Sequence, residues 1–295
     1  MLTDDGVPVE AVYEPCTAGF GAPVGGAAGP LAATPAATPA TTPAIVVAHG
    51  FTGAADRPAV RRAARVFAQR AAVITFSFRG HGRSGGRSTV GDREVLDLAA
   101  AVAWARQLGH TRVVTVGFSM GGSVVLRHGA LYTAEPVAGG AESAAGVTPV
   151  RVPERKGRIR RTGAHSDAVV SVSAPARWYY RGTAPMRRLH WVVTRPSGRL
   201  VGRYGFRTRI ATEDWDPVPL SPVASVPLIA PAPLLLVHGD RDPYFPLDHP
   251  RMLAEAAGPG GAELWLERGM GHAENAADDA LLARIAGWAT GTPPA

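Results

Sequence analysis

The feature that most constrains the fold of this chain is a regular alternation of short apolar runs with longer segments of helical periodicity. Short, mostly apolar runs are typical of strands whose two faces are both covered. Such strands are expected at 45–48, 73–78, 112–116, 169–172, 234–237 and 263–266. The alternation predicts an α/β fold, in which a mainly parallel central sheet carries helices on both faces.

The helical segments between these strands are expected at about 57–70, 92–107, 120–132, 247–257 and 276–289. In the second of them, apolar residues recur at steps of three and four and form a single stripe: Val95, Leu98, Val102 and Ala105. Sheets of this type bind ligands beyond the carboxyl ends of their strands. Functional side chains are therefore expected directly after each strand.

A candidate nucleophile follows the third expected strand, in the G-x-S-x-G segment Gly117-Phe118-Ser119-Met120-Gly121. This segment stands between a strand and a helix, where the glycines remove Cβ atoms that would clash with neighbouring backbone. The serine hydroxyl then projects into the cleft, and the helix directs its free N–H groups at developing negative charge. The pattern indicates Ser119 as a nucleophile.

A second match to the same pattern occurs at Gly82-Arg83-Ser84-Gly85-Gly86. It lies three residues further from its strand, in a loop rich in Gly and Arg, and no helix is expected directly after it. The strand–turn–helix setting that exposes a nucleophilic serine is present only around Ser119. This difference favours Ser119 over Ser84.

A serine nucleophile needs a base to take its proton and an acid to orient that base. The expected strand 234–237 is followed by two carboxylates, Asp240 and Asp242, at the edge of the sheet. The next strand leads to His272 on a glycine-flanked loop. The order of serine, aspartate and histidine along the chain is the order found in α/β-hydrolases.

Five stretches together carry a family resemblance. They are Val47-Ala48-His49-Gly50-Phe51, Phe78-Arg79-Gly80-His81-Gly82-Arg83-Ser84, Gly117-Phe118-Ser119-Met120-Gly121-Gly122, Val237-His238-Gly239-Asp240-Arg241-Asp242 and Gly271-His272. On these residues the chain resembles the α/β-hydrolase superfamily, and within it the serine hydrolases of the lipase and esterase type. The resemblance spans nearly the whole chain and implies the α/β-hydrolase fold.

The resemblance also implies roles for individual residues. Ser119 would be the nucleophile, His272 the base and then the acid, and Asp242 rather than Asp240 the residue that orients His272. The implied activity is cleavage of a carboxylic ester, or a related acyl bond, through an acyl-enzyme. The backbone N–H groups of Phe51 and Met120 are implied as oxyanion-hole donors.

Other activities remain open at this stage. One catalytic triad can serve thioesterases, amidases and carbon–carbon hydrolases as well as esterases. A non-catalytic member of the fold that binds a ligand or a protein partner is the alternative from a different class. No cofactor is implied, and no metal site is expected, because no clustered ligand motif such as H-E-x-x-H occurs.

The chain is expected to form a single domain over residues 1–295, with three segments outside the common pattern. Residues 25–44 are rich in Ala, Thr and Pro, and residues 137–167 are poor in large apolar side chains and end in a basic cluster. Both predict surface loops. Residues 177–230 lie where the resemblance places a cap over the substrate site.

The cap segment predicts a short amphipathic helix. Its apolar side would carry Met186, Leu189, Val192 and Val193, with Arg187, Arg188 and Arg195 directed away. One interpretation is a cap that packs its apolar face on the sheet and leaves its arginines in water. A second is that the arginines recognise an anionic group on a small-molecule acyl substrate or on a membrane lipid.

Charge is distributed unevenly along the chain. The formal net charge is +7, but residues 151–209 hold fifteen basic residues against Glu154 and Asp167, a local balance of +13. The remainder therefore carries −6, which argues against a uniformly basic nucleic-acid-binding protein. Of the 31 basic residues, Lys156 is the sole lysine, which also suggests a compositional bias of the source genome.

The expected location is cytoplasmic. Cys16 is the single cysteine and cannot form an internal disulfide. The first ten residues contain three acids and no basic residue, and they do not resemble a secretory signal. No apolar run reaches the length of a membrane-spanning helix, although contact with a membrane surface remains open. The sequence does not predict an oligomeric state.

Overall fold

A computed structural model describes residues 1–17, 42–133 and 163–291. Its centre is a seven-stranded sheet in the order β1-β3-β2-β4-β5-β6-β7. Strand β1 pairs antiparallel with β3, and every other neighbouring pair is parallel. The strands are β1 (Ala11–Glu14), β2 (Ala44–Ala48), β3 (Ala72–Phe76), β4 (Val113–Phe118), β5 (Ala168–Val172), β6 (Leu234–Gly239) and β7 (Glu263–Glu267). The predicted fold class is confirmed.

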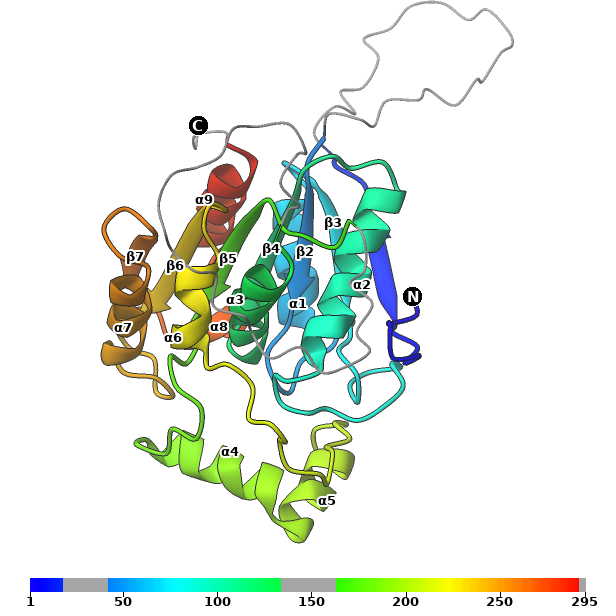
Figure 1. Ribbon diagram of the computed structural model, residues 1–295, viewed down its shortest axis with the longest axis vertical. Coiled ribbons are helices and arrows are strands. Elements are labelled where there is room, and N and C mark those ends of the chain that lie inside the picture. Colours follow the sequence, from blue (N-terminus) through cyan, green and yellow to red (C-terminus); the bar gives the residue numbers. More distant parts are fainter. Residues whose placement is uncertain (18–41, 134–162, 292–295) are drawn as a thin grey trace, which may run out of the picture.

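Helices cover both faces of this sheet (Figure 1). Two buried clusters flank it, one shared with α2, α3 and α7 and the other with α1 and α9. The helices are α1 (Pro58–Phe67), α2 (Glu94–Gln107), α3 (Met120–Leu131), α4 (Ala184–Thr194), α5 (Pro196–Tyr204), α6 (Pro222–Ser225), α7 (Asp248–Ala256), α8 (Ala273–Ala276) and α9 (Asp279–Thr290).

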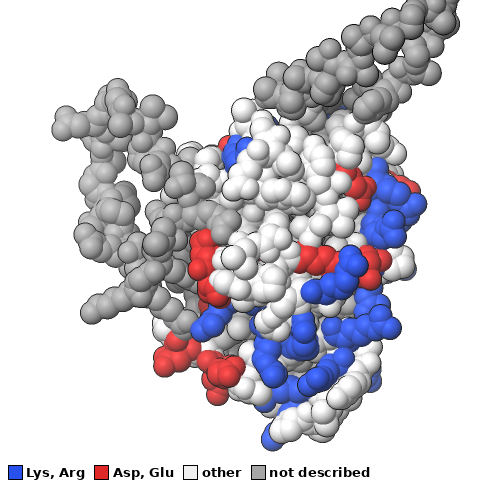
Figure 2. Space-filling model, turned by 90° about the vertical axis from the view of Figure 1, so that its right-hand side faces the viewer, with Lys and Arg blue, Asp and Glu red and all other residues white. Residues whose placement is uncertain are grey.

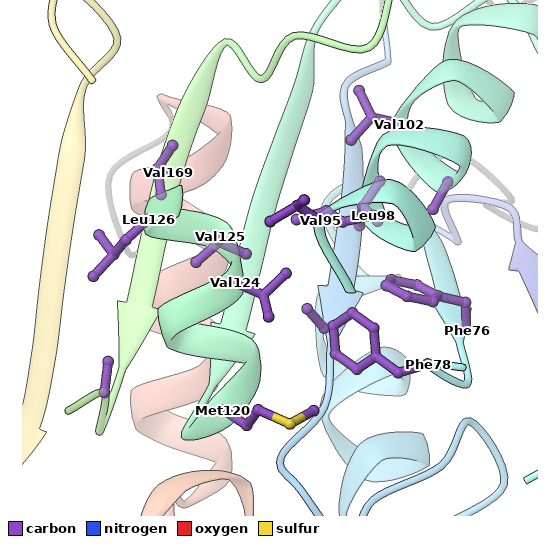
Figure 3. Packing of buried hydrophobic residues seen from close by; sticks show 14 of the residues in the cluster. Phe76, Phe78, Val95, Leu98, Val102, Met120, Val124, Val125, Leu126 and Val169 are labelled. Atoms are coloured by element: carbon purple, nitrogen blue, oxygen red, sulfur yellow. The ribbon is translucent and has the colours of Figure 1, made fainter. Parts of the chain in front are cut away.

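The parallel strands alternate their side chains between the two clusters. In β2, Ile45 and Val47 face the cluster with α1 and α9, whereas Val46 and Ala48 face the other one. All five β2 residues are buried, which explains why the run reads as continuously apolar. Figure 3 shows the cluster shared with α2, α3 and α7, where Phe76 and Phe78 lie beside side chains of α2 and α3.

The edge strand β1 was not among the sequence-based predictions. It has four residues, and Val12 and Tyr13 are exposed, so it lacks the apolar run that marks the buried strands. Its residues pair with β3 from Ala11 opposite Phe76 to Glu14 opposite Val73. Pairing with a distant strand, rather than local pattern, therefore defines this element.

The two predicted surface loops lie mainly outside the described residues. Of 25–44, the described part is 42–44, and Ala44 already belongs to β2. Of 137–167, the described part is 163–167. There Asp167 Oδ2 accepts hydrogen bonds from the Val113 amide and the Arg106 guanidinium, each at 2.6 Å. These last residues pack against the start of β4.

Helices α4 and α5 lie together at one end of the molecule, beyond the body that surrounds the sheet (Figure 1). Met186 and Val192 of α4 are buried, while Arg187 and Arg188 are exposed, as the amphipathic pattern predicts. The second helix, α5, packs closely on α4. A Cβ at Gly198 would stand only 2.2 Å from the Trp191 carbonyl oxygen, so a larger residue would not fit there. Glycine at this position allows the two backbones to touch.

Candidate active site

Ser119 stands on the sharp turn between β4 and α3. Its backbone has φ 52° and ψ −113°, in the positive-φ region that a non-glycine residue adopts only at a cost. The flanking glycines make the turn possible, because a Cβ at Gly121 would lie 2.1 Å from the Ala48 carbonyl oxygen, and one at Gly117 would lie 2.2 Å from the Gly121 carbonyl oxygen. The sequence pattern therefore has a steric cause.

The three predicted side chains form one hydrogen-bonded chain. His272 Nε2 lies 2.9 Å from Ser119 Oγ, and His272 Nδ1 lies 2.7 Å from Asp242 Oδ2. Asp242 follows β6 and His272 follows β7, so the parallel sheet brings both to the edge where β4 presents Ser119. A carboxylate only accepts, so Nδ1 carries the donated proton and Nε2 is free to accept one from the serine.

The Asp242 carboxylate is held in place on both of its oxygens. Its side chain has no solvent exposure. Oδ1 accepts the backbone N–H groups of Tyr244 and Phe245, at 2.8 and 3.1 Å, which leaves Oδ2 for the histidine. These hydrogen bonds fix the orientation in which the carboxylate meets His272.

Asp240, the other carboxylate of the pair, faces elsewhere. Its Oδ1 accepts the Gly269 amide at 2.6 Å and so joins the loops after β6 and β7. Nearby His238 is buried, and its Nε2 lies 2.9 Å from the Phe245 carbonyl oxygen. Burial lowers the pKa of His238, so its neutral form is favoured beside Asp242. Both residues shape the loops and lie outside the hydrogen-bonded chain.

Ser84, the competing serine, is buried in a structural turn. Its Oγ donates to the Ser77 carbonyl oxygen at 2.5 Å and accepts the Glu10 amide at 2.9 Å. Its hydroxyl proton is thus engaged by a backbone acceptor rather than by a base. The preference for Ser119 agrees with this geometry.

The two predicted oxyanion donors, Phe51 and Met120, line the same cavity as Ser119. The loop before Phe51 approaches the serine closely, since a Cβ at Gly50 would lie 3.5 Å from Ser119 Cβ. The Met120 amide is at the first position of α3, where a helix leaves its N–H groups without an internal acceptor. Within the described residues, neither amide has a backbone acceptor.

Buried polar groups support this loop, and one of them, Glu274, was not singled out from the sequence. Glu274 Oε1 lies 3.3 Å from the Gly50 amide, and His49 Nε2 accepts the Phe78 amide at 3.0 Å. Burial lowers the pKa of His49 to about 3, so the imidazole is a neutral acceptor. His81 Nε2 contacts the Phe51 carbonyl oxygen. No local motif marks Glu274, because its partner is 224 positions away.

A cavity of about 240 Å³ opens beside Ser119, between the body and the cap segment. Its walls are largely apolar and are formed by Phe51, Val90, Met120, Trp178, Tyr180, Met186, Leu189, Val193, Ile210, Trp215 and Phe245. Charged side chains of both signs also line it: Arg177, Arg181, Arg199, Glu213 and Asp214. The arrangement can hold an apolar group against the serine.

One wall of this cavity is a strained but well-anchored loop. Val90 has φ 55°, which is unfavourable for a β-branched residue. The buried Glu94 carboxylate accepts the amides of Thr89 and Gly91 on either side, at 2.8 and 2.9 Å. Trp215 of the cap segment donates from Nε1 to the Thr89 carbonyl oxygen at 2.7 Å. These contacts fix the wall before any ligand binds.

Two features are absent from the described residues. No three side chains of the His, Cys, Asp or Glu type gather there in a way that could hold a metal ion. Among residues 1–17, 42–133 and 163–291, no helix has the length and apolar character needed to cross a membrane.

Comparison with known proteins places this architecture in a family. The model of the alpha/beta hydrolase fold family matches residues 43–274, which is most of the chain. The chain therefore belongs to the α/β hydrolase fold family, as the sequence resemblance implied. A search of curated protein sequences finds no match.

Solved structures share the fold at low sequence identity. The esterase Pf2001 of Pyrococcus furiosus is 18% identical with a TM-score of 0.63, over 99% of this chain and 91% of that one. Est1E of Butyrivibrio proteoclasticus with bound ferulic acid is 17% identical with a TM-score of 0.55, over 99% and 96%. A putative α/β hydrolase of Agrobacterium tumefaciens is 15% identical with a TM-score of 0.55, over 98% and 92%.

Proposed function

We propose that this protein is a serine hydrolase that cleaves a carboxylic ester through an acyl-enzyme. The observation that carries the proposal is the hydrogen-bonded chain from Ser119 through His272 to Asp242 beside an apolar cavity. Nucleophile and orienting acid each stand within hydrogen-bond distance of the base, which is the geometry that activates a serine hydroxyl. The esterases among the structural neighbours share this fold and agree with the proposal.

In the proposed reaction, His272 Nε2 takes the hydroxyl proton while Ser119 Oγ attacks the ester carbonyl carbon. The imidazolium that forms is stabilised by the buried Asp242 carboxylate. His272 then gives its proton to the leaving alcohol as the tetrahedral intermediate collapses to the acyl-enzyme. A water molecule repeats the attack with His272 as base, and the acid is released with Ser119 restored.

The amides of Phe51 and Met120 are the proposed donors to the oxyanion of the tetrahedral intermediate. Both residues line the cavity beside Ser119, and neither amide has a backbone acceptor within the described residues. Each such donor contributes about 3 kcal/mol of transition-state stabilisation. The hydrogen bond from the Gly50 amide to Glu274 holds the loop that presents Phe51.

The cavity indicates an apolar acyl group of modest size. Aromatic and aliphatic side chains dominate its walls, and its volume of about 240 Å³ suits a short or medium chain or one small ring. The charged residues of the lining include both signs, so the proposed acyl group is neutral.

The proposal is tested with p-nitrophenyl esters of increasing acyl length. We expect hydrolysis by the wild type with kcat/KM highest for short to medium chains, and a loss of at least about 10⁴-fold in Ser119→Ala. Ser84→Ala is the matched control and should retain esterase activity. Full activity in Ser119→Ala would reject the mechanism.

A non-catalytic protein that binds a ligand in the same cavity is the alternative. It predicts tight binding of an acyl compound with no turnover of any ester. The complete set of Ser119, His272 and Asp242 favours the enzyme. A protein that only binds a ligand does not need a buried carboxylate hydrogen-bonded to a histidine. Thioester and amide substrates use the same residues and belong in the same panel.

A further inference from the structure

The outer face of the cap helices carries exposed apolar side chains among arginines. We call this surface the cap patch, and it consists of Arg187, Arg188, Trp191 and Arg195 on or next to α4, and Leu200, Val201, Arg203 and Tyr204 on α5. Trp191 is 44% exposed, Leu200 58% and Tyr204 74%. These large apolar side chains lie outside the buried core, and apolar side chains that gather at a surface are typical of an interaction site.

The arrangement on α4 brings aromatic and cationic groups onto one strip. Arg187 and Arg188 precede Trp191 by four and three positions on α4, so these three residues are neighbours on the helix surface. Arg195 directly follows the helix. The opposite side of α4 is already used, since Met186 and Val192 are buried. The outward face of the helix therefore carries exposed arginines and a tryptophan, while the inward face carries the buried apolar residues.

Helix α5 repeats this design. Its inner side consists of Gly198 and Gly202, which pack against α4 and the segment near Ile210. Its outer side exposes Leu200, Val201 and Tyr204, and the Arg203 guanidinium stacks over the Tyr204 ring at 5.5 Å. Apolar side chains thus point to the solvent while glycines point inward. A surface helix that only packs on the core of its own protein has the opposite pattern, with its apolar side chains inward.

The stretch of chain that carries the cap patch is strongly basic. Residues 177–212 contain nine arginines and no Asp or Glu. Within the described residues, the four arginines of the cap patch make no ion pair with a carboxylate. Figure 2 shows arginine side chains gathered toward the lower end of the molecule, where Figure 1 places α4 and α5. This surface is complementary to an anionic partner.

We propose that the cap patch docks the protein on the surface of an anionic lipid bilayer. Tryptophan, tyrosine and leucine can enter the boundary between headgroups and acyl chains while arginines contact lipid phosphates. A nucleic acid would use the arginines but would leave Leu200 and Val201 without a role. The inner side of α4, with Met186, Leu189 and Val193, lines the cavity, so docking would set the cap between the bilayer and the proposed active site.

The first test is flotation of the full-length protein with vesicles of phosphatidylcholine alone or mixed with phosphatidylglycerol. We expect flotation with the anionic vesicles and not with the neutral ones. Loss of one arginine near such a surface weakens binding about fivefold. The triple variant Arg187→Glu/Arg188→Glu/Arg203→Glu should therefore lose more than about 100-fold in partitioning.

The matched control reverses three exposed arginines of the body, in Arg61→Glu/Arg65→Glu/Arg93→Glu. It changes the net charge equally and should float like the wild type, apart from a small general effect. Equal loss of binding in both triple variants would overturn the proposal. Failure of the wild type to float with anionic vesicles, or binding to duplex DNA in its place, would also overturn it.

The apolar part of the cap patch has its own test. Leu200→Gln/Tyr204→Gln leaves the charge unchanged and should weaken flotation at least tenfold. Trp191 fluorescence should be quenched by brominated acyl chains, and Trp191→Phe should remove that quenching. Undiminished flotation of the double variant would contradict insertion. All of these measurements can be made with Ser119→Ala, so they do not depend on the proposed catalytic function.

Discussion

Two carboxylates separated by a single residue make different contacts at this site. Asp242 is buried and bonded to His272 Nδ1, whereas Asp240 accepts the Gly269 amide near the surface. We expect Asp242→Asn to lower kcat about 10⁴-fold, because the amide no longer stabilises the imidazolium and can impose the wrong tautomer. Asp240→Asn should lower kcat less than tenfold. Steady-state kinetics with one ester decides the assignment, and equal losses in both variants would contradict it.

The glycine after the nucleophile is required by backbone contact rather than by flexibility. A Cβ at Gly121 would meet the carbonyl oxygens of Ala48 and His49 at 2.1 and 2.7 Å. We expect Gly121→Ala to lower the free energy of unfolding by about 3 kcal/mol and to abolish activity. Gly258→Ala, at φ 72° with open space around it, should cost about 1 kcal/mol. Urea unfolding compares them, and a Gly121→Ala cost no larger than that of Gly258→Ala would contradict the steric account.

The residues predictable from the sequence are those that a local motif marks. Ser119, Asp242 and His272 each follow a strand, and the parallel sheet gathers them at one edge. Glu274 and Val90 carry no such mark. Their roles arise from a hydrogen bond to the distant Gly50 and from a positive φ fixed by surrounding contacts, which tertiary packing alone decides.

At the scale of elements, the buried strands and their helices were predictable because both faces of the sheet are covered. Strand β1 was not, because it is short and half-exposed and owes its form to pairing with β3. In the cap segment, the pattern predicted the inner face of α4 but not the second helix. Helix α5 depends on close packing at Gly198, which no apolar periodicity signals.

The first turn of α7 contains a buried histidine that couples stability to pH. His249 Nδ1 accepts the Ala176 amide at 2.9 Å, and burial lowers the pKa of His249 to about 4. An unfolded histidine has a pKa near 6.5, so this stabilisation is complete above about pH 6.5 and is lost as the pH falls toward 4. His249→Gln keeps an acceptor without titrating.

We therefore expect the urea midpoint of the wild type to fall between pH 7 and pH 4, and that of His249→Gln to fall less. His49 and His128, whose pKa values burial lowers to about 3, should extend the decline at lower pH. A steeper pH dependence in His249→Gln than in the wild type would contradict this assignment.

At the scale of the whole molecule, the net charge of +7 divides between a body and a cationic cap. The nine arginines between residues 177 and 212 lie on the segment that covers the cavity, and the exposed apolar side chains of α4 and α5 lie among them. Part of the excess positive charge counted in the sequence therefore lies on the cap segment that covers the cavity. The neighbouring basic cluster before residue 163 lies outside the described residues.

The proposed site is itself a property of the whole molecule, because Ser119 and His272 are 153 positions apart in the chain. Reaction with a fluorophosphonate probe, followed by mass spectrometry of the labelled peptide, tests directly whether Ser119 is an activated nucleophile. We expect stoichiometric labelling of Ser119 in the folded protein, with none on Ser84, and loss of labelling in urea and in His272→Ala. An unlabelled Ser119 in the folded wild type, or equal labelling after unfolding, would contradict this assignment.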